Sequence, residues 1–243
     1  MAIFFREALS ARLVKINLMK ENMFLQPHLV KFKRLMQYLS TLIVLLFSIY
    51  VTQLNTQVVD HFSQQTEVSA VDYEQQSPVV INMLLLTEDQ SFFNHSGVDF
   101  KEIARVVRDY VLYDKPLRGA STLTQQLIKN ELLTRERSID RKLKEALMAI
   151  LLEISFDKKF ILNYYLNHVY LGQKGHLVVN GFAHASRFYF NKPMNELTLE
   201  EVATLVALVK GPGYYHPIKH PQRLAKRRAL VLGLYHKYEK IVK

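Results

Sequence analysis

Residues 119–130 read GASTLTQQLIKN, a short loop that leads into a helical pattern. A hydroxyl residue before an apolar periodic run is typical of a helix start, so we expect a helix over 121–133 with Ser121 or Thr122 as its cap. Thr122, Gln126 and Lys129 share one stripe of this helix, at i, i+4 and i+7. This stripe suits a ligand with sugar hydroxyls and phosphate oxygens, although an ordinary capped surface helix has the same spacing and the spacing alone favours it.

Further helical patterns lie on both sides of this segment. The clearest covers 139–154, where apolar residues return every three or four positions. Other predicted helices cover 100–113, 158–167, 180–190 and 198–209, and a last one starts near 221. No alternating strand pattern competes and no internal repeat is visible, so we predict a mainly α domain.

Charged residues begin the predicted helix over 139–154. Arg141 and Glu145 are i, i+4 neighbours with Lys142 beside them, and such pairs are common and add only about 0.2–0.5 kcal/mol. The same stripe continues through the apolar Met148 and Leu152. A face that is charged at one end and apolar at the other suits the wall of a cleft.

Two adjacent carboxylates, Glu88 and Asp89, follow the apolar run over 83–86, with His95 shortly after them. A carboxylate pair is usually a solvated helix end. An apolar setting, however, can make a carboxylate an effective general base, so Glu88 and Asp89 are candidates for that role.

The composition excludes several classes of protein. The chain has 243 residues, a formal net charge of +10, 49% hydrophobic residues and no Cys. A disulfide-stapled module and a Cys-ligated zinc or iron–sulfur site both need thiols and are excluded. The apolar content is sufficient to bury a core, so a disordered chain is excluded as well.

A long segment without charge lies near the N-terminus. Residues 35–59 contain no charged side chain, and about 20 helical residues span the hydrocarbon core of a bilayer. Lys31, Lys33 and Arg34 precede this run, and Lys/Arg favour the cytoplasmic side, so we expect the N-terminus inside and the bulk of the chain outside. A cleaved signal peptide is the competing interpretation, because residues 68–70 (VSA) resemble a cleavage site. They lie well past the apolar run, which favours an uncleaved anchor.

Taken together, these segments resemble the peptidoglycan glycosyltransferase family, the polymerases of bacterial cell-wall glycan. Five blocks carry the resemblance over about 80–230: Glu88-Asp89 with Phe92, His95, Gly97 and Asp99; 119–130; Arg141-Lys142 with Glu145, Ala149 and Leu152-Glu153; Ile161-Leu162 with 165–167 and 169–172; and Tyr189-Phe190 to Leu208, Lys210 and Pro217. The sequence of these blocks is most similar to the glycosyltransferase half of class A penicillin-binding proteins. The sequence leaves no residues for their transpeptidase domain and contains no Lys-Thr-Gly motif, so we expect the monofunctional type.

The resemblance implies an organisation and a location. It implies a single transmembrane helix, a lysozyme-like helical lobe and a small membrane-associated jaw lobe. The expected parts are a basic cytoplasmic tail (1–34), an anchor (35–59), a stalk (60–77) and the glycosyltransferase domain (78–243), with the jaw at about 100–118. The expected location is the bacterial cytoplasmic (inner) membrane, single-pass, with the catalytic domain extracytoplasmic.

The resemblance also implies a reaction. Lipid II, a polyprenyl-pyrophosphate disaccharide-pentapeptide, is joined with inversion into β-1,4-linked glycan, and polyprenyl pyrophosphate is released. Glu88 matches the general base. Glu145 matches a second carboxylate, which would either hold a divalent cation, Mg²⁺ or Mn²⁺, on the pyrophosphate or position the basic side chains. No organic cofactor is implied.

The resemblance also implies a set of substrate-binding residues, which match family positions: Asp89, Phe92, His95, Thr122, Gln126, Lys129, Arg141 and Lys142. Asp89 is expected to organise the first block rather than to titrate. The expected partners are lipid II, the growing glycan strand, membrane lipid and other cell-wall synthesis or division proteins, with no nucleic acid. Gln90, Arg118 and Asn163 depart from the family's usual residues, which puts efficiency and fine positioning in doubt but not the reaction class.

Two other functions compete. A lytic transglycosylase or lysozyme-like hydrolase would act on the same glycan, but it would leave the basic positions Lys129, Arg141 and Lys142 unexplained. An inactive membrane-anchored scaffold would not need both carboxylates. Nucleic-acid binding, suggested only by the net charge, has no motif in the sequence and conflicts with an extracytoplasmic domain.

Overall fold

The computed structural model describes residues 2–64, 71–116, 119–134, 136 and 138–242, with side chains described between 30 and 238. The chain divides into two compact units, Met1–Gln53 and Leu54–Lys243. The side chains of most of the predicted basic tail, and the parts of the expected stalk and jaw at 65–70 and 117–118, lie outside the described residues. Each unit is described by itself.

A single helix, α1 (Ala2–Gln64), makes up the described part of the first unit and continues into the second. Its segment Val30–Gln64 is long enough to cross a membrane, and the most apolar 18 residues within it have a mean hydropathy of 1.8. Large apolar side chains are exposed all along 30–50, which no soluble core accounts for. One membrane-spanning candidate near the N-terminus agrees with the predicted anchor.

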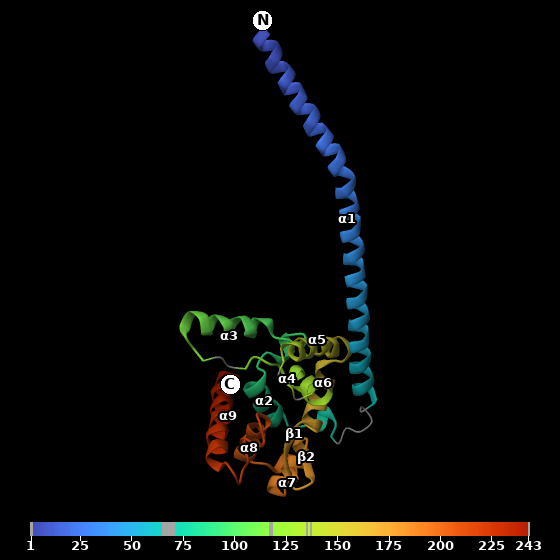
Figure 1. Cartoon of the computed structure of the whole chain (residues 1–243). Helices are drawn as coiled ribbons and strands as arrows, with labels where there is room; N and C mark the ends of the chain where they lie inside the picture. Colours follow the sequence, from blue (N-terminus) through green and yellow to red (C-terminus); the bar gives the residue numbers. More distant parts are fainter. Residues whose placement is uncertain (1, 65–70, 117–118, 135, 137, 243) are drawn as a thin grey trace. The chain divides into compact units, whose positions relative to one another are not determined.

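The second unit is mainly helical, as predicted (Figure 1). Its helices are α2 (Pro78–Glu88), α3 (Phe100–Tyr113), α4 (Leu123–Leu132), α5 (Ile139–Ser155), α6 (Lys158–His168), α7 (Phe182–Phe190), α8 (Leu199–Val209) and α9 (Pro221–Val242), with short 3₁₀ turns at Tyr73–Gln75, Phe92–Asn94 and Met194–Glu196. Figure 1 shows α3 extending sideways from the other helices of this unit. The helices predicted from the sequence agree with the observed ones to within about two residues at each described end.

The core of the second unit is built around α8. A capping box starts this helix, in which Thr198 and Glu201 satisfy each other's backbone donors. All residues from Val202 to Leu208 are buried, and α8 packs against both α2 and α9. The ends of α2, α8 and α9 are therefore held in fixed relative positions.

A β-hairpin that the sequence analysis missed follows α6. Strands β1 (Tyr170–Lys174) and β2 (Leu177–Asn180) pair antiparallel, with Gly172 opposite Val179, and the helix expected from 180 starts at Phe182. Neither strand alternates buried and exposed residues, so it has no two-residue periodicity to detect. The expectation that no strand is present was wrong for this short element.

The compact unit begins earlier than the expected boundary near Pro78. Leu54, Val58 and Phe62 are buried at four-residue intervals, and the ring of Phe62 packs edge-on against Tyr164 with centroids 4.8 Å apart. Uncharged residues such as Leu54 look alike in a membrane anchor and in a core, which is why the sequence did not separate the two. Residues 54–64, assigned to the anchor and stalk, therefore belong to the folded domain.

The described residues 71–77 of the expected stalk also pack on the domain. The buried Gln76 donates from its amide to Oδ1 of Asn163 in α6 at 2.9 Å, and Asn167 donates to the carbonyl of Val71 at 2.9 Å. Asn163, one of the departures from the family's usual residues, thus has a structural role here.

Candidate active site

Glu88 ends α2 with its carboxylate almost fully enclosed. The side chain is 4% exposed, and its two oxygens face different helices. Arg227 in α9 donates from Nη2 to Oε1 at 2.7 Å, while Gln126 in α4 donates from Nε2 to Oε2 at a longer 3.4 Å. The apolar helix α2 thus delivers a carboxylate into a polar site, with one oxygen firmly held and the other loosely held.

The amide of Gln126 is itself oriented by a buried tyrosine. The hydroxyl of Tyr165 in α6 donates to Oε1 of Gln126 at 3.0 Å, which directs the amide nitrogen of Gln126 toward Glu88. Burial, and then the negative charges of Glu88 and Asp89, raise the pKa of Tyr165 well above its usual value. Tyr165 is therefore a permanent hydrogen-bond donor.

Asp89 serves the fold next to Glu88. Its Oδ2 accepts a hydrogen bond from the backbone N–H of Leu123 at 2.8 Å, at the first turn of α4, and lies 3.1 Å from Nε2 of His95. A carboxylate at this position satisfies a free N–H group and complements the positive end of the helix. Asp89 thus ties the end of α2 to the start of α4, which agrees with the expected organising role.

Thr122, one of the two predicted caps, caps α4 and also lines the smaller of the two cavities described below. Its hydroxyl accepts from the backbone N–H of Gln125 at 3.1 Å and donates to the carbonyl of Gly97 at 2.6 Å, and the residue is only 2% exposed. The other two residues of the stripe, Gln126 and Lys129, line the larger cavity.

Phe92 and His95 lie in the interior beside the site. Both side chains are buried, and neither residue lines the two cavities described below. His95 lies between two carboxylates, with Nδ1 3.7 Å from Oε1 of Glu153 on α5. These two predicted substrate-binding residues are thus placed to support the segment that carries Glu88.

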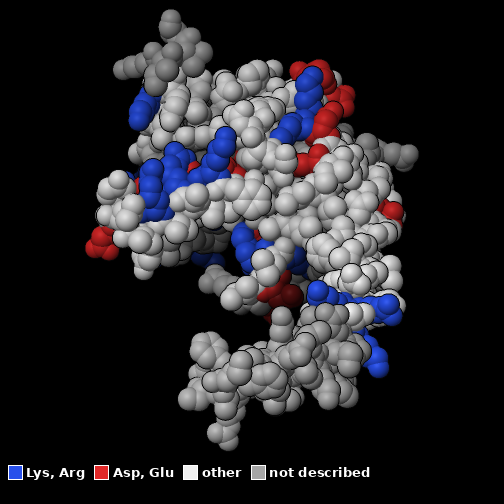
Figure 2. Space-filling view, turned by 90° about the horizontal axis from the view of Figure 1, so that it is seen from above, with Lys and Arg blue, Asp and Glu red and all other residues white. Residues whose placement is uncertain are grey.

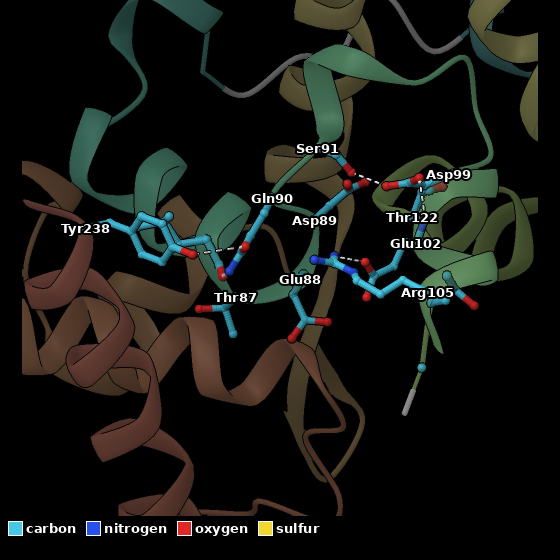
Figure 3. A pocket seen from close by; sticks show the side chains of 14 residues that line it. Thr87, Glu88, Asp89, Gln90, Ser91, Asp99, Glu102, Arg105, Thr122 and Tyr238 are labelled. Atoms are coloured by element: carbon cyan, nitrogen blue, oxygen red, sulfur yellow. Dashed lines mark hydrogen bonds and ion pairs between the residues drawn. The ribbon is translucent and has the colours of Figure 1, made fainter. Parts of the chain in front are cut away.

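Two cavities meet at Glu88. The larger, of about 660 Å³, is lined by polar and basic residues that include Gln126, Lys129, Arg141 and Lys210. The smaller, of about 400 Å³, includes Asp99, Glu102, Arg105 and Tyr238, and Figure 3 shows these side chains around it. Both cavities share Thr87, Glu88, Gly119 and Ser121 as lining residues. Glu88 therefore lies where a basic cavity adjoins a more acidic one.

Glu145 organises two of the predicted cations. It is 1% exposed, and its carboxylate pairs with Lys142 through one oxygen and with Nη1 of Arg141, at 3.3 Å, through the other. Lys142 also donates to the hydroxyl of Ser121 at 2.8 Å, next to the loop that lines both cavities. Glu145 thus holds Arg141 and Lys142 toward the site.

Lys129 brings a further positive charge to the larger cavity. Its ammonium forms no ion pair with the residues that the structure describes. Partial burial, and the nearby cations Lys142, Arg141 and Lys210, lower the pKa of Lys129 despite the opposing charge of Glu145. Basic side chains also cover more of the face in Figure 2 than acidic ones do.

The donor set at Glu145 does not suit a metal ion held by the protein. Both carboxylate oxygens face cations, and the described residues contain no group of three His, Asp or Glu side chains placed to share an ion. Of the two roles left open for Glu145, the observed contacts are those of a residue that positions basic side chains.

Sequence reasoning missed Arg227, Tyr165 and Lys210 as site residues. One signal was available for Arg227, because it lies on the same face of α9 as the buried Leu224 and Val231, at i+3 and i+7 from Leu224. A charged residue on an apolar stripe needs a buried partner. The partner's identity, Glu88, depends on the packing of α9 against α2.

Comparison with known proteins identifies the relatives of the chain. Residues 55–236 match a family described as transglycosylase. Penicillin-binding protein 1B of Haemophilus influenzae is 43% identical over 165 residues, which are 68% of this chain and 21% of that protein. Penicillin-binding protein 1B of Escherichia coli is 44% identical over 156 residues (64% and 18%), and penicillin-binding protein 1A of Aquifex aeolicus is 46% identical over 153 residues (63% and 20%). The chain spans about a fifth of the length of these relatives.

Proposed function

Since the chain belongs to the transglycosylase family of peptidoglycan glycosyltransferases, we propose that it polymerises lipid II into β-1,4-linked glycan and releases polyprenyl pyrophosphate. The observation that carries this proposal is the position of Glu88 at the junction of a basic and a more acidic cavity. A transferase needs both a donor and an acceptor next to its base, and a junction of two cavities provides the space for them.

Glu88 acts as the general base in the proposed reaction. It removes the proton from the 4-hydroxyl of the acceptor GlcNAc while that oxygen attacks the anomeric carbon of the lipid-linked MurNAc. The new C–O bond forms as the bond to the pyrophosphate oxygen breaks on the opposite face, so the configuration inverts. The geometry supports Oε2 as the proton acceptor, because Arg227 binds Oε1 closely and Gln126 holds Oε2 only at 3.4 Å.

The leaving group determines what the larger cavity must provide. A pyrophosphate departs as an anion, so its departure requires positive charge near the breaking bond more than a strong general acid. Lys129 and Arg141 line the larger cavity, and Lys142 lies beside it through its bond to Ser121. A hydrolase that cleaves finished glycan releases a sugar hydroxyl and has no need of these cations.

The location is proposed from the anchor and its flanks. The uncharged stretch 35–53, which lies within Val30–Gln64 and before the folded domain, spans the cytoplasmic membrane of a bacterium. The cluster of Lys31, Lys33 and Arg34 in front of it supports a cytoplasmic N-terminus with the catalytic domain outside. Helix α3 supports contact with the lipid surface, because it exposes Val107, Val111 and Leu112 next to basic residues.

The test is incubation of the detergent-solubilised full chain with labelled lipid II, with sizing of the products. We expect glycan polymer from lipid II and no release of fragments from preformed cell-wall sacculi. Solubilised sacculi without polymer would identify a hydrolase. The absence of both polymer and released fragments would identify a scaffold. Parallel reactions with EDTA, or with added Mg²⁺ or Mn²⁺, test whether the reaction needs the predicted divalent cation. The binding of other cell-wall proteins stays a prediction.

A further inference from the structure

Helix α9 brings a second side chain to the site, three turns beyond Arg227. Tyr238 lies 11 residues after Arg227, which is close to three full turns of an α-helix, so the two side chains share one face of α9. The buried Val231 lies between them on this face, at i+4 from Arg227. The packing that holds Arg227 against Glu88 therefore also holds Tyr238, which is half-buried.

The hydroxyl of Tyr238 contacts Gln90, two residues after Glu88. It donates to Oε1 of Gln90 at 3.4 Å, while the amide nitrogen of Gln90 donates to the carbonyl of Leu86 in α2 at 3.0 Å. The amide of Gln90 is thus held at both ends, and its oxygen is directed toward Tyr238. Gln90, one of the departures from the family's usual residues, therefore helps to orient the ring of Tyr238.

Tyr238 and Glu88 both line the smaller cavity. Figure 3 shows the ring of Tyr238 on one side of Glu88, and Arg105 with its partner Glu102 on the other side. The volume of about 400 Å³ lies within the range of small-ligand sites. Among the described residues that line this cavity, Tyr238 is the only aromatic one.

The chemistry of the smaller cavity suits a sugar better than a phosphate. Its lining includes the acids Glu88, Asp99 and Glu102, and Arg105, the one basic residue among the described lining residues, is paired with Glu102. Carboxylates accept hydrogen bonds from sugar hydroxyls but repel phosphate oxygens. The ring of Tyr238 adds an apolar surface on which the C–H groups of a pyranose can pack.

We propose that Tyr238 is a specificity-determining residue for the acceptor, and that its ring stacks on the pyranose ring of the acceptor GlcNAc in the smaller cavity. This inference rests on the proposed function, in which Glu88 accepts the proton of the 4-hydroxyl of that sugar. Stacking fixes the plane of the sugar, and the surrounding carboxylates then restrict which hydroxyl points toward Glu88. The contact belongs to the acceptor, because the pyrophosphate of the donor requires the basic residues of the larger cavity.

Two analogues of lipid II separate the acceptor from the donor in the experiment. An analogue with a methyl group on the 4-oxygen of GlcNAc serves only as donor, because it has no hydroxyl for the attack. An analogue in which a methylene group replaces the oxygen between the anomeric carbon and the pyrophosphate serves only as acceptor, because it has no leaving group. Together they allow a single transfer by the full chain in detergent, with a separate KM for each analogue.

Replacing Tyr238 by Leu should raise KM for the acceptor analogue about tenfold and leave KM for the donor analogue unchanged. Tyr238→Phe keeps the ring and loses only a long hydrogen bond, so its KM for the acceptor analogue should stay within about twofold of the wild type. Tyr235→Leu is the matched control, at another half-buried tyrosine of α9 that lines neither cavity, and both of its KM values should match the wild type.

Calorimetric binding of the acceptor analogue alone should rank the variants in the same order, and thermal unfolding checks that each variant is folded. Three results would overturn the role of Tyr238: equal KM values in Tyr238→Leu and Tyr235→Leu, an equal rise in both KM values of Tyr238→Leu, or a tenfold rise for the acceptor analogue in Tyr238→Phe. The last result decides the matter even if Tyr238→Leu does not fold. Each leaves the proposed function intact, whereas a wild-type chain that makes no polymer from lipid II would contradict the proposed function itself.

Discussion

Arg227 and Glu88, separated by 139 residues in the sequence, form an ion pair of 2.7 Å between α9 and α2. Both side chains are largely buried, at 16% and 4% exposed. This pair fixes the carboxylate that we propose as the general base, and it makes the last helix of the domain part of the site.

Replacing Arg227 by Met should destabilise the protein and reduce polymerisation. The substitution leaves the enclosed carboxylate of Glu88 without its partner, which costs on the order of 3 kcal/mol in the free energy of unfolding. Chemical unfolding in detergent measures the loss, and Lys226→Met, at an exposed neighbour in α9, is the matched control.

The double variant Glu88→Gln with Arg227→Met tests whether the two residues act as a pair. Its loss of stability should be smaller than the sum of the two single losses, because both charges are removed together. Additive losses would show that the ion pair does not couple α9 to α2.

Asp89→Asn should lower both stability and activity. The variant weakens the bond to the N–H of Leu123 and the contact with His95, and we expect a loss of about 1–3 kcal/mol in the free energy of unfolding. Polymerisation should fall as well, because Asp89 positions the adjacent Glu88. Asp140→Asn, at an exposed acid in the first turn of α5, is the control, and an equal effect of both variants would contradict this role.

The lowered pKa of Lys129 predicts a loss of substrate affinity on the alkaline side. Burial and the cations Lys142, Arg141 and Lys210 favour the neutral amine, while Glu145 opposes them. The charged form binds the pyrophosphate, so KM should rise as the pH passes upward through this pKa, at a lower pH than for an ordinary lysine.

Two substitutions, with Lys219→Arg as the control, test whether Lys129 causes this rise in KM. Lys129→Arg keeps its charge and should remove the rise in KM, whereas Lys219→Arg should not change it. Lys210→Met removes one of the neighbouring cations and should move the rise in KM to higher pH. If the rise in KM occurs at the same pH in all three variants, it must come from the titration of another group.

Gly97→Ala should destabilise the domain more than Gly213→Ala. Gly97 has a φ of +86°, and a Cβ there would collide with the backbone carbonyl of Ala149 in α5. Gly213 has open space around it. A loss of about 2–4 kcal/mol is expected for Gly97→Ala, measured by thermal unfolding, and equal stability of the two variants would be inconsistent with the close approach of α5.

The helices could be predicted because their signals are local, and the predicted Glu88, Lys129 and Arg141 do lie around one cavity. Periodicity and caps both lie within short windows of sequence, and the described helices start close to the predicted positions. The contacts of Glu88 with Arg227 and of Gln126 with Tyr165 could not be predicted, because each depends on how two distant helices pack.

Residue chemistry alone does not show which side chains the fold itself uses. The cap at Thr122 could be predicted, but its bond to the carbonyl of Gly97 and the burial of Phe92 depend on how distant segments pack. Likewise, the uncharged Leu54 and Val58 extend the apolar run of the anchor but pack within the folded domain.

The most direct test of the central claim is polymerisation of labelled lipid II by the full-length Glu88→Gln variant, compared with the wild type in the same detergent. The amide keeps the shape of the side chain but cannot accept the proton, so we predict polymer from the wild type and none from the variant, with unchanged helical content in both. Glycan of normal length and yield from Glu88→Gln would contradict the assignment of Glu88 as the general base.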